Sequence, residues 1–152
     1  MRHGEYDPNT MSLSAHGELE AYNTTMKLVK KYSLIPDIIL HSPIKRAIET
    51  AHKVNKTFNE ATGRDITLIE INDLKENNPT DAYEFLKDVN NKNLVVLAIT
   101  HSPNICGLSQ DLGGQIIKAY TAEAIVYETN AENWQEAAYS SRFVKTIKPM
   151  AS

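Results

Sequence analysis

The feature that most constrains the fold is a run of six consecutive apolar residues at 94–99. A strand without polar residues must be covered on both faces, which is typical of a parallel sheet between two layers of helices. A second short apolar run follows Pro36 and predicts another buried strand at 37–40. Each run leads into a Ser-Pro pair and then a helical pattern, so the chain is expected to have an α/β fold.

The remaining segments alternate in the same way. Apolar residues recur at helical spacing over 14–32, 44–58, 82–89 and 105–112, and further strands are predicted at 66–71 and 124–127. The pair Gly113-Gly114 is expected to end the 105–112 helix. Residues 72–80 are rich in turn formers, and the pattern is less regular after Trp134. We therefore predict a three-layer α/β/α sandwich with a mainly parallel central sheet, in one domain covering 1–152.

Composition narrows the classes of function. Hydrophobic residues make up 41% of the chain and charged residues 23%, as in ordinary soluble domains. The formal net charge of −3 provides no general attraction for nucleic acid or anionic membrane, and no apolar run approaches the roughly 20 residues of a membrane-spanning helix. The single cysteine, Cys106, is expected to be a small core residue and cannot form an internal disulfide. We expect a cytoplasmic protein without a nucleic-acid or membrane partner.

Two strand–helix junctions carry the residues of chemical interest. Serine is a good N-cap and proline suits the first helical turn, so Ser42-Pro43 and Ser102-Pro103 are expected to begin helices at the carboxyl ends of two strands. Helix N-termini and the neighbouring Arg46 and His101 would then face the same edge of the sheet, where an anion binds well. Histidines and carboxylates do not cluster at ligand spacing in the sequence, so no metal or other cofactor is expected.

Four motifs in order then point to a family. They are Met1-Arg2-His3-Gly4-Glu5, Leu13-Ser14-Ala15-His16-Gly17, the segment 42–51 (Ser-Pro-Ile-Lys-Arg-Ala-Ile-Glu-Thr-Ala), and Thr100-His101-Ser102-Pro103. With these motifs the chain resembles the histidine phosphatase (phosphoglycerate mutase-like) superfamily over roughly residues 1–125. The compact spacing between the third and fourth strands is similar to that of the small SixA-type phosphohistidine phosphatases.

The resemblance implies roles for individual residues. His3 would attack phosphorus and form a covalent phosphohistidine, which water then hydrolyses. Arg2 and Arg46 would bind the phosphoryl oxygens, a protonated His101 would be a third donor, and Ser102 would contact the substrate. The substrate implied is phosphohistidine in a partner protein. A phosphatase or mutase for a small phosphorylated molecule, and a non-catalytic phosphate-binding protein, remain alternatives.

Other positions have two readings each. Asp73 and Glu76 lie where larger family members carry a general acid, and they are either substrate contacts or exposed loop charges. A phosphohistidine substrate needs this acid less, because imidazole leaves more readily than an alkoxide. His41 either lines the rim of the site or does not, and Glu5 either orients the substrate or is a surface carboxylate. His16 is expected on the surface of its helix.

The N-terminus departs from the family pattern. Family members carry several apolar residues before Arg-His-Gly, and these form a central strand, whereas this sequence begins at Met1. We therefore expect a truncated first strand. The neighbouring strands would then have unpaired backbone N–H and C=O groups. These could be paired by residues upstream of Met1, by a rearranged sheet or by a second chain. The oligomeric state is not predicted.

Overall fold

The computed structural model describes residues 1–75 and 82–150, arranged as helices around parallel strands. The helices are α1 (Ala15–Lys30), α2 (Lys45–Thr62), the short 3₁₀ helix η1 (Asn72–Leu74), α3 (Ala82–Leu86), α4 (Ser102–Gly113) and α5 (Trp134–Ser140). The strands are β1 (Ile38–His41), β2 (Thr67–Glu70), β3 (Val96–Ile99), β4 (Ala124–Thr129) and β5 (Ser141–Ile147). Strands β2, β1 and β3 form a parallel sheet in that order, and β4 pairs with β5 in an antiparallel ribbon.

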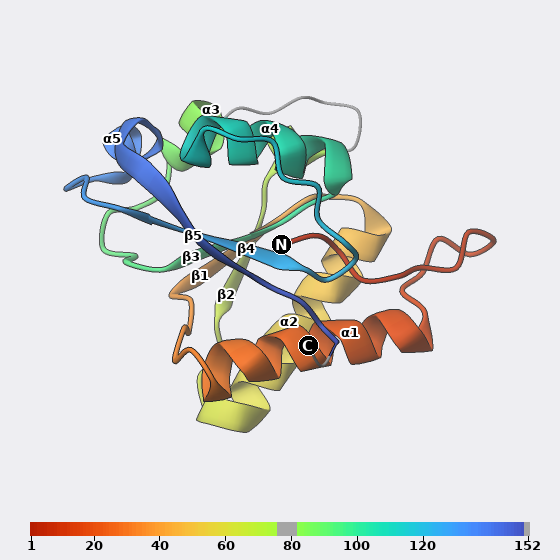
Figure 1. Cartoon of the computed structure of the whole chain (residues 1–152). Helices are drawn as coiled ribbons and strands as arrows, with labels where there is room; N and C mark the ends of the chain where they lie inside the picture. The colour runs from red at the N-terminus through yellow and green to blue at the C-terminus, as the bar shows by residue number, and fades with distance from the viewer. Residues whose placement is uncertain (76–81, 151–152) are drawn as a thin grey trace.

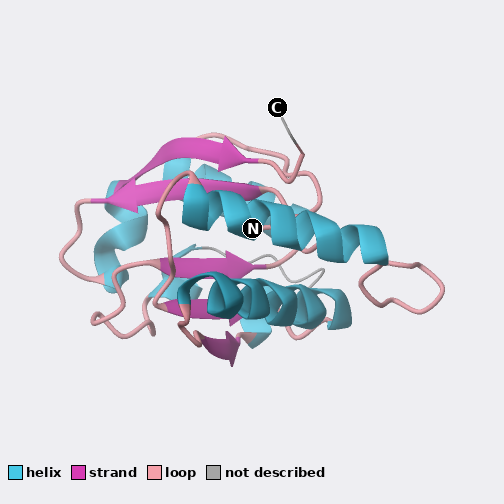
Figure 2. Ribbon diagram, turned by 90° about the horizontal axis from the view of Figure 1, so that it is seen from below, coloured by secondary structure: helices cyan, strands magenta, loops and turns pink. Residues whose placement is uncertain are grey.

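The helices form two layers, as predicted. Helices α1 and α2 lie side by side below the strands, and α3, α4 and α5 lie above them (Figures 1 and 2). Successive residues of β1 point to opposite layers, so Ile39 packs with the α1 and α2 core whereas Leu40 packs with the other core. Both are buried, which explains why this strand contains no polar residue before His41. The α/β class with a parallel sheet flanked by helices is confirmed.

Some predicted boundaries shift. β3 begins at Val96 rather than at residue 94, because the amides of Leu94 and Val95 donate to Asp37 Oδ2 instead of joining the sheet. The expectation that Ser42 caps α2 is wrong, since Ser42 Oγ accepts from the Ile44 amide before the helix starts. At the second junction Ser102 is already helical and His101 occupies the N-cap position.

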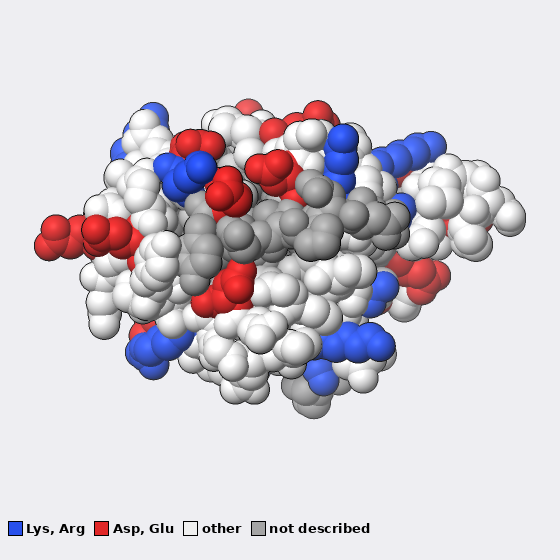
Figure 3. Space-filling model, turned by 90° about the horizontal axis from the view of Figure 1, so that it is seen from above, with Lys and Arg blue, Asp and Glu red and all other residues white. Residues whose placement is uncertain are grey.

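The structure defines the end of α4 and shows that the C-terminal segment is regular. Gly114 ends α4 as expected, with a φ of 77° that favours glycine. Beyond Trp134 the chain forms α5 and then β5, whose pairing with β4 was not predicted. Among the described residues, no helix is long and apolar enough to cross a membrane. Acidic and basic side chains are interspersed on the face over α3 and α4 (Figure 3).

The N-terminal residues join the sheet through a single bridge. Arg2 pairs with Thr100 in parallel, and its amide donates to the Glu123 carbonyl, 3.0 Å away, so the N-terminus joins the end of β3 to the start of β4. The Met1 ammonium donates to the Ala98 carbonyl at 2.8 Å. Beyond this point a largely apolar cavity of about 390 Å³ separates the two strands. It is lined along β3 and β4 by Val96, Leu97, Ala98, Ala124, Ile125 and Val126.

Candidate active site

His3 is held at the junction between the parallel sheet and the β4–β5 ribbon. Its amide donates to the Thr100 carbonyl at 3.0 Å, and its carbonyl accepts from the Ala122 amide at 2.9 Å. The residue is 3% exposed. Hydrogen bonds on both sides fix its backbone, so the imidazole has a defined position although it lies close to the chain terminus.

The hydrogen bonds of the His3 ring define its tautomer. Nδ1 lies 2.8 Å from the Gly4 carbonyl oxygen, which can only accept, so Nδ1 carries the hydrogen. Nε2 accepts a hydrogen bond of 3.2 Å from Arg46 Nε, which can only donate. Nε2 therefore carries the lone pair, and this nitrogen is the one able to attack an electrophile.

Burial and surrounding positive charge keep this imidazole neutral. Burial lowers the pKa of His3 from 6.5 to about 4, and the charges of Arg46, Arg2 and His101 act in the same direction. The Gly4 carbonyl opposes the shift. His3 is thus unprotonated at neutral pH, the state in which an imidazole can act as a nucleophile.

Arg46 lies in the first turn of α2 and is 3% exposed. Its guanidinium stacks 4.4 Å from the centre of the Tyr6 ring, and Tyr6 in turn meets the His3 ring edge-on at 5.6 Å. Thr50 Oγ1 accepts from the Gly4 amide at 3.0 Å and donates to the Arg46 carbonyl at 2.7 Å. One hydroxyl thus connects the loop that carries His3 to the helix that carries Arg46.

Arg2 and His101 complete the surroundings of His3. Arg2 Nη1 donates to the Ala119 carbonyl at 3.0 Å, whereas its buried Nε has no hydrogen-bond partner within the described part of the chain. His101 is 4% exposed at the N-terminus of α4, with Nδ1 3.4 Å from Thr100 Oγ1. Thr100 Oγ1 itself donates to the Leu74 carbonyl at 2.8 Å, which fixes this corner of the site. An imidazole, two guanidiniums and a helix N-terminus together suit an oxyanion.

Where the structure describes the remaining predicted site residues, it gives each a position but no hydrogen bond to His3 or Arg46 within the described part of the chain. Ser102 is the first residue of α4 and is partly exposed. His41 ends β1 and is buried, with Nδ1 3.0 Å from the Ser42 carbonyl. Asp73 is exposed on η1, and Glu76 lies outside the described residues. Their roles in binding stay predictions.

The sequence did not indicate two groups that the fold brings together. Tyr6 packs against the His3 and Arg46 side chains, and Thr50 binds the Gly4 amide and the Arg46 carbonyl. The only signal in the sequence was the spacing of four residues from Arg46 to Thr50, which places both on one helix face. The expectation that histidines and carboxylates do not cluster is wrong for Glu5, His16 and Glu20, whose ligand atoms lie within 4.8 Å of one another. The spacing of His16 and Glu20, one helical turn apart, was the available signal.

Comparison with solved structures identifies the fold. The chain is similar to the protein histidine phosphatase SixA complexed with tungstate, with a TM-score of 0.78, 19% identity, and coverage of 98% of this chain and 94% of that chain. It is also similar to a putative phosphohistidine phosphatase SixA from Agrobacterium tumefaciens, with a TM-score of 0.74, 18% identity, and coverage of 98% and 95%.

A further similar structure is a phosphoserine phosphatase in complex with 3-phosphoglyceric acid from Entamoeba histolytica. Its TM-score is 0.67 at 14% identity, with coverage of 97% of this chain and 94% of that chain. Neither protein-family models nor curated proteins match the sequence. At these identities the comparison establishes the fold, which is that of the histidine phosphatases, as the resemblance of the motifs predicted.

Proposed function

We propose that this protein is a phosphatase that uses His3 as a covalent nucleophile and acts on phosphohistidine in a partner protein. The observation that carries the proposal is the tautomer of His3. A neutral Nε2 with its lone pair faces Arg46 at 3.2 Å, inside a group of cationic side chains. This combination provides a nucleophile and charge neutralisation for a phosphoryl group at the same place.

The steps follow from the hydrogen bonds. In the free protein, the Arg46 Nε–H group occupies the lone pair of His3 Nε2. A phosphoryl oxygen can accept that hydrogen instead, which frees the lone pair to form the N–P bond. The bond from phosphorus to the substrate nitrogen breaks at the same time, and the substrate ring, protonated on its other nitrogen, leaves as neutral imidazole. The Gly4 carbonyl stabilises the positive charge that develops on the His3 ring. Water then attacks phosphorus, the N–P bond breaks, and inorganic phosphate leaves with neutral His3 restored.

Arg2 has a matching role. Its buried Nε is a donor that a phosphoryl oxygen would satisfy, while Nη1 stays on the Ala119 carbonyl and keeps the guanidinium oriented. Loss of one such donor typically lowers the rate by about 10²–10³-fold. His101 and Ser102 would add contacts from the N-terminus of α4.

The choice of phosphohistidine has separate support. The similar structures include a protein histidine phosphatase SixA, and Asp73, one of the two candidate acids, is exposed. Imidazole is a good leaving group, so this reaction needs a strong general acid less than ester hydrolysis does. The single cysteine is consistent with a cytoplasmic location, which is part of the proposal.

A substrate comparison tests the proposal. The purified protein is assayed with a phosphohistidine peptide and with a panel of small phosphate esters, alongside His3→Ala and, as a control, His52→Ala, which changes an exposed histidine on α2. We expect turnover of the peptide only, lost in His3→Ala and kept in His52→Ala. Comparable turnover of an ester would favour the small-molecule phosphatase, and activity without His3 would refute the mechanism.

A further inference from the structure

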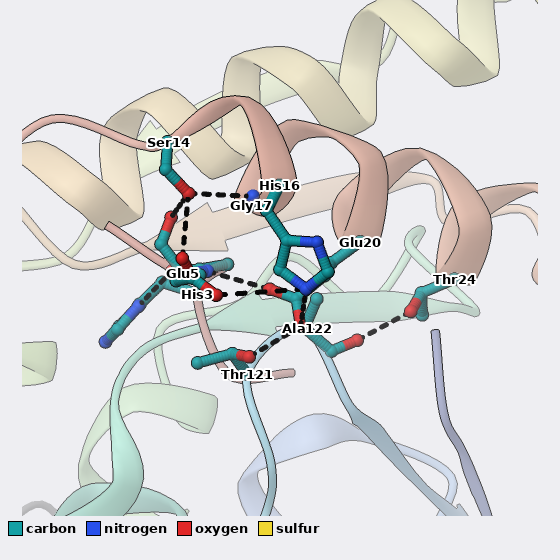
Figure 4. Close-up of polar contacts among 10 residues, drawn as sticks. His3, Glu5, Ser14, His16, Gly17, Glu20, Thr24, Thr121 and Ala122 are labelled. Atoms are coloured by element: carbon teal, nitrogen blue, oxygen red, sulfur yellow. Dashed lines mark hydrogen bonds and ion pairs between the residues drawn. The ribbon is translucent and has the colours of Figure 1, made fainter. Parts of the chain in front are cut away.

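A second group of functional side chains lies beside the active-site loop. Glu5 belongs to the segment that follows His3, and His16 and Glu20 lie one turn apart on α1 (Figure 4). Each offers one atom of the kind that binds metal ions, and these three atoms all lie within 4.8 Å of one another. The proposed phosphatase mechanism uses none of them.

The fold holds the Glu5 backbone firmly against α1. The Glu5 carbonyl accepts from the Ser14 amide at 2.9 Å, and the Glu5 amide donates to Glu20 Oε1 at 2.9 Å. A side chain at residue 17 would prevent this, since a Cβ on Gly17 would lie 2.0 Å from the Glu5 carbonyl oxygen. Glycine at this position lets the segment after His3 approach the helix closely.

Glu20 is fixed as well. Its side chain is 13% exposed, and its Oε2 accepts a hydrogen bond of 2.7 Å from the Thr121 hydroxyl. Polar partners of this kind orient the ligands of metal sites in proteins. The side chains of His16 and Glu5 are 59% and 53% exposed, so a hydrated ion has access to the group from solvent.

The separations from the histidine nitrogen to the two carboxylates leave room for an ion between them. His16 Nε2 lies 3.8 Å from Glu5 Oε2 and 3.7 Å from Glu20 Oε2. Without a metal these contacts are ion pairs when the imidazole is protonated, and they are longer than N–H···O hydrogen bonds, which span about 2.7–3.2 Å. The two distances are near the separation of about 3.4 Å between two ligands of a tetrahedral zinc ion, where each ligand atom lies roughly 2.0–2.2 Å from the metal.

We propose that Glu5, His16 and Glu20 bind a divalent transition-metal ion of the zinc type, with solvent in the remaining position. One imidazole and two carboxylates are ligands that zinc accepts, and their combined charge of −2 is neutralised by the ion. The bound ion links the segment after His3 to α1. Its role is to stabilise that segment, and the proposal does not depend on the phosphatase activity.

Binding of the metal alone tests the proposal. Protein freed of metal by a chelator is titrated with zinc chloride in a calorimeter, and with cobalt chloride while the visible absorption bands of tetrahedral Co²⁺ are recorded. We expect one ion per chain, visible cobalt bands, and a higher thermal unfolding midpoint when zinc is present.

Two histidine variants distinguish this site from others. His16→Ala removes an exposed ligand and should weaken binding at least about tenfold, since loss of even an indirect partner costs about 10- to 100-fold. His52→Ala removes an exposed histidine outside the group and should bind as the wild type does. Glu5→Gln should weaken binding while the fold is retained. Absence of binding by the wild type, or equal binding by His16→Ala and His52→Ala, would overturn the proposal.

Discussion

Replacement of Thr50 by valine tests how the active-site loop is positioned. Thr50 is fully buried, and its hydroxyl is the acceptor for the Gly4 amide, next to His3. Valine has nearly the same shape but cannot accept a hydrogen bond, so the variant leaves a buried amide without a partner. The expected loss in free energy of unfolding is about 1–3 kcal/mol. Activity should fall as well, because displacement of a reacting group by about 1 Å costs up to 10²-fold.

Thr57 on the same helix provides a matched control. It is 2% exposed, and its hydroxyl donates to the Lys53 carbonyl four residues earlier, as the Thr50 hydroxyl donates to the Arg46 carbonyl. Among the described residues, the hydrogen bond recorded for the Thr57 hydroxyl goes to Lys53 and not to the active-site loop. Urea denaturation and initial rates are measured for Thr50→Val, Thr57→Val and Thr50→Ser. Equal losses in both valine variants, or full activity of Thr50→Val, would refute the reasoning, whereas recovery in Thr50→Ser would support it.

Three further predictions follow from burial and packing. Below pH 6.5 the unfolded chain protonates His3, whereas the folded protein does so only near pH 4. The free energy of unfolding should therefore decrease by up to about 3 kcal/mol as the pH is lowered from 6.5 to 4. Urea denaturation should show this dependence in the wild type and a smaller one in His3→Gln. Gly17→Ala should lower the free energy of unfolding by about 3 kcal/mol or more, because the new Cβ meets the Glu5 carbonyl. An unchanged free energy of unfolding would contradict the close packing. A short apolar extension joined to Met1 should fill the cavity beside β3 and raise the thermal unfolding midpoint. Each buried valine or leucine should add about 1.5–3 kcal/mol to the free energy of unfolding, whereas a Gly-Ser extension should leave the midpoint unchanged.

The parts of the fold that the sequence predicted are those with strong local signals. The apolar strands and the helices with regular periodicity were found because burial on one face or both leaves a clear pattern, as in β1 and α2. The pairing of β5 with β4 was missed because β5 has exposed residues such as Phe143 and Val144, which weaken the alternation. A cap such as Ser42 was misplaced because a serine can bind a nearby amide in a turn as well as in a helix.

The candidate site was predicted only as far as its motifs extend. Arg2, His3, Arg46 and His101 were found through motifs and their positions at strand ends. The contacts that give them chemical character come from distant segments and leave no pattern in the sequence. The tautomer of His3 depends on Arg46, 43 residues away, and the Glu5–Glu20 contact depends on a glycine that allows two backbones to meet.

The most direct test of the account is the location of a trapped phosphoryl group. The protein is mixed with a radiolabelled phosphohistidine peptide, stopped with denaturant within one turnover, and mapped by peptide mass spectrometry. The account predicts an acid-labile phosphate on Nε2 of His3, and no labelled protein in His3→Ala. A phosphate on another residue, or steady turnover with His3 never labelled, would contradict it.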